Sequence, residues 1–409
     1  MPSAPLSKAI PFFPYPQVYL SEQDDLERIF RDVGRRGAFI MQRDLLQFEA
    51  HLAAFLAVRH AVGVANATDG LLIALRAAGI KAGDEVLFCS HTMVATAAAI
   101  HFAGAIPVPI DCGDDHLMNP VAAADAITPR TRAILPTQLN GRTADMDALV
   151  HLAQRHELVI VEDAAQALGS KWNSRAAGTF GAAGVISFFP AKLLGCLGDG
   201  GAVVCNSEQI AGAVKALHDH GRDASGEVRG WGFNSRLDNL QAAILDWRLG
   251  RYGDAVNTRR QIARQYQQEL QGISEMILPP GPDENTRHFD VYQNYEVEAE
   301  DRDRLSEYLT DHGIGTSLPW GGRAVHQWPD LDFRVSLPRV EQLFRKVLLL
   351  PMHAWLSEQE VSAVCDAIRQ FYRGRPNAPQ KAVSQKTISP KTSLRANAAP
   401  SSEPESVKP

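Results

Sequence analysis

AGVISFFPAKLLGCLGDGGAVV, at residues 183–204, joins two short apolar runs through a glycine-rich turn. The first run delivers Ser187 and then Lys192, and the second run begins after Gly201. Neither run alternates with polar residues, which is typical of strands that are buried on both faces of a helix-covered sheet. A lysine between an apolar run and small residues has a desolvated amine, which favours the neutral and nucleophilic form.

Segments on the N-terminal side of this stretch extend the pattern into an α/β domain. Further apolar runs precede it, namely HAVGVAN, DEVLFCS, AIPVPID, RAILPTQ and ELVIVED. Helical segments lie between them, namely TDGLLIALRAAG, TMVATAAAIHFAG, VAAADAI and MDALVHLAQRH. Strands that alternate with helices predict a mostly parallel sheet sandwiched by helices.

The same patterns divide the chain into four parts. We expect an N-terminal arm at 1–20, a large α/β domain at 21–250, a smaller α+β domain at 251–373 and a tail at 374–409. Apolar residues at helical spacing predict a helix over 26–59. The tail is rich in proline, serine, lysine, alanine and glutamine, so we expect it to be disordered because it has too little apolar surface to bury.

Composition and charge exclude several classes of protein. A chain of 409 residues, 45% of them hydrophobic, can bury a core without disulfides or metals, and we expect no metal site. The net charge of −6 gives no long-range attraction to nucleic acid or to a membrane surface. Five cysteines without paired spacing indicate reduced thiols and a cytoplasmic location. We find no signal peptide and no apolar stretch of the ~20 residues that a membrane helix needs.

Two segments contain residues suited to binding a phosphate. In NATDGLL, Thr68 is predicted to cap a helix whose free N–H groups can receive an anion. In GWGFNSRLDNLQAAI, Asn234 and Arg236 lie in a loop before a helix and are natural donors to phosphate or carboxylate. Simple helix capping is the alternative explanation for Thr68 and Asn234.

A third segment, LVIVEDAAQALG, places Asp163 directly after a buried strand. α/β folds present ligand-binding residues at this position. A buried carboxylate must be hydrogen-bonded or paired with a cation, so a helix cap or a structural ion pair is the alternative. Gln166 follows one turn later and can reach the same ligand.

Taken in order, T-D, EDAAQALG, SFFPAKLLGCLGDGGA and GFNSRLDNLQAA resemble the DegT/DnrJ/EryC1/StrS family of pyridoxal-phosphate sugar aminotransferases. The resemblance extends over 12–372 and implies aminotransferase fold type I with pyridoxal 5′-phosphate (PLP) as cofactor. It implies that Lys192 bonds to the cofactor aldehyde, while Asp163 keeps the pyridine nitrogen protonated so that the ring acts as an electron sink. Gln166 matches the family residue near the ring hydroxyl.

The resemblance also implies a phosphate site shared between two subunits. Thr68, the backbone of Asp69 and Ser187 match the phosphate cradle of the family. Asn234 matches an asparagine that reaches the phosphate from the neighbouring subunit, so a homodimer with shared active sites is expected.

The chain departs from the family pattern in two places. In SHTMVATAAAI, Met93 stands where the family has an aromatic residue that stacks on the pyridine ring. A thioether can still pack on an aromatic face, at about 0.3–1.5 kcal/mol, and the ring of His91 is the alternative. In SLPWGGRAVHQW, His326 matches a family histidine, while Trp320 and Arg323 belong to a stretch that differs from the family.

These observations imply transfer of an amino group from an amino acid, L-glutamate, to a keto group of a nucleotide-linked deoxysugar in amino-sugar or polysaccharide biosynthesis. The candidate substrate-binding residues are His91, Arg236, Trp320, Arg323 and His326. A cyclitol ketone as acceptor and a non-catalytic binding protein are the alternatives. A sugar dehydratase of the same family has histidine in place of the lysine, and a dinucleotide oxidoreductase requires a glycine fingerprint that the chain lacks.

Overall fold

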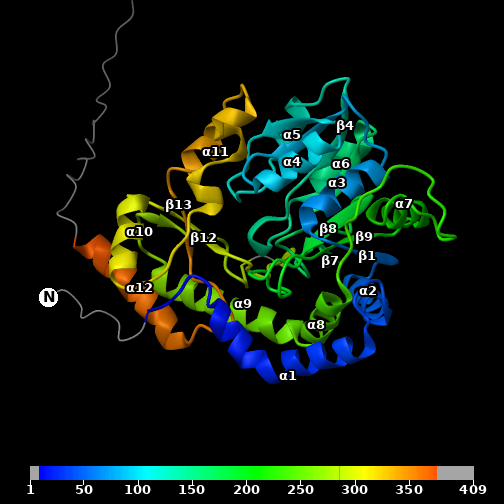
Figure 1. Ribbon diagram of the computed structural model, residues 1–409. Coiled ribbons are helices and arrows are strands. Elements are labelled where there is room, and N and C mark those ends of the chain that lie inside the picture. Colours follow the sequence, from blue (N-terminus) through cyan, green and yellow to red (C-terminus); the bar gives the residue numbers. More distant parts are fainter. Residues whose placement is uncertain (1–8, 285, 375–409) are drawn as a thin grey trace, which may run out of the picture. The chain divides into compact units, whose positions relative to one another are not determined.

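A seven-stranded sheet forms the core of the larger lobe (Figure 1). The computed structural model describes residues 9–284 and 286–374, so the predicted tail after Gly374 lies outside the described residues. The strand order is β1-β9-β8-β5-β4-β2-β3. The strands are β1 (His60–Val64), β2 (Glu85–Cys89), β3 (Ile106–Ile110), β4 (Thr131–Leu135), β5 (Val159–Asp163), β8 (Ala183–Ser187) and β9 (Gly201–Cys205).

The strands from β8 to β3 are parallel to one another, and only β9 is reversed relative to its neighbours β8 and β1. The predicted α/β class with a mostly parallel sheet is therefore confirmed. The reversal of β9 follows from the glycine-rich turn, because that connection contains no helix that could cross over to a parallel position.

Helices cover both faces of this sheet. Val86 and Phe88 of β2 belong to the core under one set of helices, while Leu87 and Cys89 belong to the core on the other face. The first face carries α3 (Ala67–Ala77), α4 (Val94–Phe102) and α7 (Glu208–His218). The second face carries α2 (Arg43–Leu56), α5 (Pro120–Asp125), α6 (Met146–Arg155) and α8 (Asn239–Leu249).

The N-terminal region contains two helices where the sequence predicted one. α1 (Tyr15–Arg36) begins inside the predicted arm and packs against α8. It ends at Gly37, which adopts a left-handed conformation with φ 60° and whose N–H caps the helix. The expectation of one continuous helix over 26–59 is therefore wrong, because the apolar periodicity continues across a break that Gly37 makes.

A second, antiparallel sheet follows α9 (Tyr252–Leu270). It consists of β10 (Met276–Ile277), β12 (Tyr295–Ala299) and β13 (Val347–Leu350), and it shares a separate apolar core with α9, α10 (Arg302–Asp311) and α12 (Glu358–Arg373). Short elements complete the described chain: β6 (Lys171–Trp172), β7 (Arg175–Ala176), β11 (His288–Phe289), α11 (Pro338–Leu343), and the 3₁₀ turns η1 (Leu139–Gly141), η2 (Pro319–Gly322), η3 (Val325–Gln327) and η4 (Pro329–Leu331).

The predicted boundary at 250 falls between α8 and α9. The described residues up to Arg373 form one compact unit, and the division into a large and a small domain stays a prediction. β11 pairs with β6, which connects the chain after α9 to the larger lobe. Within the described ranges, no helix combines the length and apolar character of a membrane span.

Candidate active site

Lys192 lies in the loop after β8, and hydrogen bonds fix the backbone around it. Its N–H donates to the carbonyl of Phe189 at 2.8 Å. The side chain of Gln293, next to β12, clamps both flanking residues: Nε2 donates to the carbonyl of Ala191 at 3.0 Å and Oε1 accepts from the N–H of Leu193 at 2.9 Å. Burial lowers the pKa of the Lys192 amine from 10.5 to about 8, and the charge of Asp163 opposes this shift.

Asp163 ends β5, and its side chain is held from two sides. The residue is 4% exposed, the Thr96 hydroxyl donates to Oδ2 at 2.7 Å, and the Ala165 N–H donates to Oδ1 at 3.2 Å. Burial raises the pKa of Asp163, while these two donors and the charge of Lys192 lower it. The structure thus brings Lys192 and Asp163 within electrostatic range of each other, as the sequence predicts.

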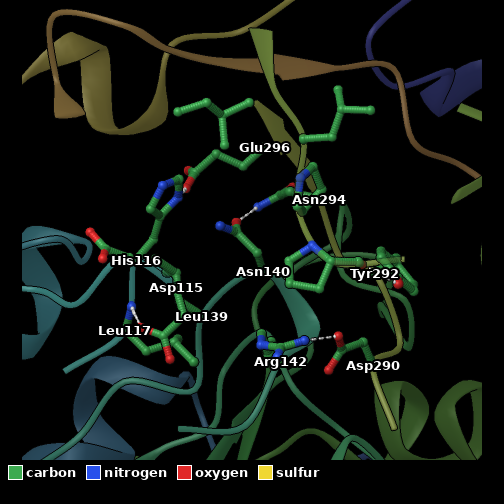
Figure 2. A pocket seen from close by; sticks show the side chains of 15 residues that line it. Asp115, His116, Leu117, Leu139, Asn140, Arg142, Asp290, Tyr292, Asn294 and Glu296 are labelled. Carbon is green, nitrogen blue, oxygen red and sulfur yellow. Dashed lines mark hydrogen bonds and ion pairs between the residues drawn. The ribbon is translucent and has the colours of Figure 1, made fainter. Parts of the chain in front are cut away.

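The side chain of Gln166 is oriented by two asparagines. Its Oε1 accepts from the backbone N–H of Asn140 at 2.8 Å and from Nδ2 of Asn294 at 3.4 Å. The asparagines are joined to each other, since Asn294 Nδ2 donates to Asn140 Oδ1 at 2.8 Å (Figure 2). With the oxygen occupied, the amide nitrogen of Gln166 is the group available to a ligand. Neither asparagine belongs to a motif that could have identified it from the sequence.

The start of α3 differs from the prediction in its cap. Asn66, not Thr68, is the N-cap: its backbone is extended and its Oδ1 accepts from the N–H of Asp69 at 2.8 Å. The predicted capping role of Thr68 is therefore wrong, because the helix begins at Ala67, two residues before the start that a cap at Thr68 would give. Thr68 lies half-buried in the first turn, where its hydroxyl stays available to an anion.

Two glycines let the start of α3 approach the sheet closely. A Cβ on Gly70 would lie 2.8 Å from Cγ1 of Val185, and a Cβ on Gly201 would lie 2.8 Å from the backbone nitrogen of Ala67. Ser187 ends β8 near this point and is half-buried, and its Oγ accepts from the Phe189 N–H at 3.3 Å. The helix terminus and the ends of the strands thus form one cradle.

Asn234 and Arg236 lie in the loop before α8. Asn234 is exposed, and its backbone pairs with Asp219. Arg236 donates from Nη1 to Asp219 at 3.3 Å, while its buried Nε has no hydrogen-bond partner among the described residues. The Asn234 side chain is thus accessible at the surface of this loop.

Met93 and His91 lie in the turn before α4 but in different environments. Met93 is 52% exposed. His91 is buried, with Nε2 3.3 Å from Glu296 Oε2 of β12 and Nδ1 3.2 Å from the carbonyl of His116. Met93 is therefore the side chain of this turn that is free to lie against a ligand.

The substrate candidates of the C-terminal region have separate surroundings. His326 is buried, its Nδ1 lies 2.7 Å from Ser90 Oγ, and its backbone N–H donates to the same oxygen at 3.1 Å. This contact places His326 beside the turn that carries Met93. Arg323 is exposed and its guanidinium lies 5.1 Å from the ring of Trp328, while Trp320 is half-buried with a left-handed backbone, φ 53°.

Comparisons with known proteins identify the family of the chain. The model of the DegT/DnrJ/EryC1/StrS aminotransferase family matches residues 21–369. A curated relative, the dTDP-3-amino-3,4,6-trideoxy-alpha-D-glucose transaminase of Streptomyces venezuelae, is 38% identical over 368 residues, which cover 88% of this chain and 96% of that protein.

Solved structures match over similar lengths. DesV of S. venezuelae, in complex with a ketimine intermediate, has a TM-score of 0.86 and 37% identity, and the match covers 91% of this chain and 100% of that one. NtdA from Bacillus subtilis, with bound cofactor PMP, has a TM-score of 0.81 and 27% identity, and the match covers 90% of this chain and 87% of that one.

Proposed function

We propose that this chain moves an amino group from L-glutamate to the keto group of a nucleotide-linked deoxysugar. The proposal starts from its family, because the chain belongs to the DegT/DnrJ/EryC1/StrS aminotransferase family. The chain is a PLP-dependent aminotransferase. The name of the S. venezuelae transaminase supports a nucleotide-linked amino sugar as the product class. The observation that carries the proposal is the pair of Lys192 and Asp163, an amine and a buried carboxylate that act on each other in one site.

The residues of the site fit PLP in number and in chemical character. When bound, PLP supplies an aldehyde and an electron-withdrawing ring. The chain offers an amine for the aldehyde, a carboxylate for the ring nitrogen, an amide N–H for the ring hydroxyl and a helix terminus with hydroxyls for the phosphate. These groups are Lys192, Asp163 and Gln166, with Thr68 at the start of α3 and Ser187 at the end of β8 for the phosphate. The N–H of Asp69, which the resemblance assigns to the phosphate, already donates to Asn66.

Lys192 is the residue that moves a proton. With its pKa lowered by burial to about 8, roughly a tenth of the amine is neutral at pH 7, far more than for a lysine of ordinary pKa. A neutral Nζ can accept the proton from the α-carbon of the amino donor and return it at the neighbouring position, as general acid-base catalysis requires. Asp163 has the complementary task, because a buried carboxylate without a full cation partner stabilises a proton on the nitrogen that faces it.

We propose a homodimer in which Asn234 of one subunit completes the phosphate site of the other. The exposure of Asn234 in its loop supports this. We also propose the cytoplasm as the compartment, which the five free and buried cysteines support.

The test is turnover by the purified protein with PLP, glutamate and a panel of nucleotide-linked ketosugars. We expect the wild-type protein to aminate a member of the panel. Lys192→Ala is expected to lose about 10²–10⁴-fold or more in rate, because the proton-transfer group is gone. The matched control, Lys215→Ala, removes an exposed lysine of α7 and is expected to keep the wild-type rate.

Near-parental turnover by Lys192→Ala would contradict the role of this residue. Turnover of a free inosose, with none of any nucleotide-linked ketosugar, would assign the acceptor to the cyclitol class instead.

A further inference from the structure

Three threonine hydroxyls form a row behind Asp163. Thr96 Oγ1 lies 2.7 Å from Asp163 Oδ2, Thr92 Oγ1 lies 2.8 Å from Thr96 Oγ1, and Thr137 Oγ1 lies 3.0 Å from Thr92 Oγ1. They come from α4, from the turn before it and from the segment after β4. Thr96, Thr92 and Thr137 are 0%, 1% and 5% exposed, so water does not compete for these contacts.

The direction of every hydrogen bond in this row follows from the carboxylate at its end. An ionised carboxylate only accepts, so Thr96 must donate its single proton to Asp163. Thr96 can then only accept from Thr92, and Thr92 can only accept from Thr137. All three O–H groups therefore point toward Asp163, and aligned chains of this kind polarise one another.

The row opposes protonation of Asp163 on Oδ2. A proton there would face the proton of Thr96, so the three hydroxyls would have to reverse together or a buried hydrogen bond would be lost. Among the described residues, the charged group that acts on Asp163 is Lys192, whose amine is needed for proton transfer. The hydroxyl dipoles on Oδ2, together with the Ala165 N–H on Oδ1, are thus the fixed part of the field that stabilises this buried charge.

We infer that Thr92 and Thr137 are positioning residues for the amino transfer, acting through Thr96 to keep Asp163 a carboxylate that holds the proton on the cofactor's ring nitrogen. The inference rests on the proposed function, because the ring nitrogen belongs to PLP. Thr137 pairs with Asp163 through the backbone, but the hydroxyls of Thr92 and Thr137 bond only to the next hydroxyl of the row, so their effect on the carboxylate passes along the row.

Threonine-to-valine substitutions test the inference because they remove one hydroxyl at nearly constant shape. The readout is the ¹⁵N chemical shift of the ring nitrogen of bound ¹⁵N-labelled PLP at one pH near neutrality, where Asp163 and the ring nitrogen share one proton, and it reports the protonated fraction of the nitrogen independently of turnover. We expect the ratio of protonated to unprotonated nitrogen to fall about 10- to 100-fold in Thr96→Val, where a bond to a charged group is lost, and about 2- to 10-fold in Thr92→Val. Thr137→Val should have the smallest effect of the three.

Serine variants and a control separate this role from packing. Thr92→Ser and Thr137→Ser keep the hydroxyl and are expected to retain the wild-type shift. Thr143→Val removes a hydroxyl that is equally buried but bonds to Ser170 at 2.6 Å, outside the row, and is expected to leave the shift unchanged. If Thr92→Val does not fold, Thr137→Val and the two serine variants still decide the question.

An unchanged shift in the valine variants would overturn the inference, as would an equal change in Thr143→Val or a serine variant that behaves like its valine counterpart. The proposed function fails in a different way, namely if the wild-type protein neither binds PLP nor transfers an amino group. A wild-type enzyme that works, together with valine variants that match it, contradicts the inference alone.

Discussion

At the scale of single residues, the site depends on opposite shifts of two ionisable groups. Burial lowers the pKa of the Lys192 amine to about 8 and raises the pKa of the Asp163 carboxyl, so burial brings both values toward neutrality. Because each group opposes the shift of the other, the site keeps one basic amine and one carboxylate within reach of a common ligand. Such pairs of groups with perturbed pKa values are typical of acid-base sites.

Met93 is the residue at which a substitution is expected to strengthen the binding of PLP. Met93→Phe places an aromatic ring at an exposed position of the turn before α4, and aromatic pairs contribute about 0.5–1.5 kcal/mol beyond area burial. We therefore expect the dissociation constant for PLP to fall about 2- to 10-fold, measured by fluorescence titration of the apoprotein. Val94→Phe adds the same ring one position along and serves as the control. A weaker affinity in Met93→Phe than in the control would show that no ring lies over Met93.

Single residues also show how much of the site the sequence predicts. Lys192 and Asp163 follow apolar strands, and the ends of parallel strands meet at one edge of a sheet, so their proximity was predictable. The cap of α3 was not, because Asn66 and Thr68 are both good capping residues and only the backbone shows where the helix begins. The threonine row was also missed, since a threonine such as Thr96 inside a helical segment gives no pattern that distinguishes a donor to a carboxylate from ordinary polarity.

At the scale of elements, local patterns predicted most strands and helices, while their breaks and directions required the structure. The six predicted strands from HAVGVAN to AGVISFF are present in the central sheet. The break at Gly37 and the reversal of β9 were not predicted, because both depend on connections and on packing between distant segments. The contact of His116, in the loop after β3, with Glu296 of β12 was not predicted either, because the two residues lie 180 positions apart in the sequence.

That contact makes stability depend on pH. His116 Nδ1 lies 2.8 Å from Glu296 Oε1 (Figure 2). His116 Nε2 lies 3.1 Å from Glu298 Oε1. His91 faces the first carboxylate and Arg339 the second. Burial lowers the pKa of His116, but the two carboxylates raise it more, to about 9.

We expect the stabilisation by His116 to be complete below its unfolded pKa of about 6.5 and to be lost as the pH rises through about 9. The loss in unfolding free energy is at most about 3 kcal/mol, at 1.36 kcal/mol for each pKa unit. Urea denaturation of the wild-type protein and of His116→Gln across this pH range measures the free energy of unfolding of each. The difference between the two free energies checks the prediction, because contributions from other groups such as Lys192 cancel in it. His151→Gln, at an exposed histidine of α6, should show the wild-type dependence. A constant difference between wild type and His116→Gln would exclude the ionised pair.

At the scale of the whole molecule, one exposed loop carries both a candidate site residue and large apolar side chains. Asn234 is exposed, and on the same loop Trp231 is 96% exposed and Val228 is 65% exposed. Solvent is an unfavourable surrounding for a full tryptophan side chain, whereas subunit interfaces are enriched in this residue. The loop thus has the composition expected of a contact surface, as the proposed homodimer requires.

Mixing two inactive variants tests whether the sites are shared. If each site takes Lys192 from one subunit and Asn234 from the other, a hybrid dimer of Lys192→Ala and Asn234→Ala subunits has two different sites. One site contains both substitutions and the other contains neither. We expect each hybrid to regain about half of the wild-type activity when PLP is limiting, since Asn234→Ala weakens phosphate binding about 10- to 100-fold. Activity after mixing that does not exceed the sum of the two variants, in a sample where mass spectrometry shows hybrids, would place Asn234 in the site of its own chain. Mixing Lys192→Ala with Gln166→Ala is the matched control, because both residues act within one chain and no intact site can form.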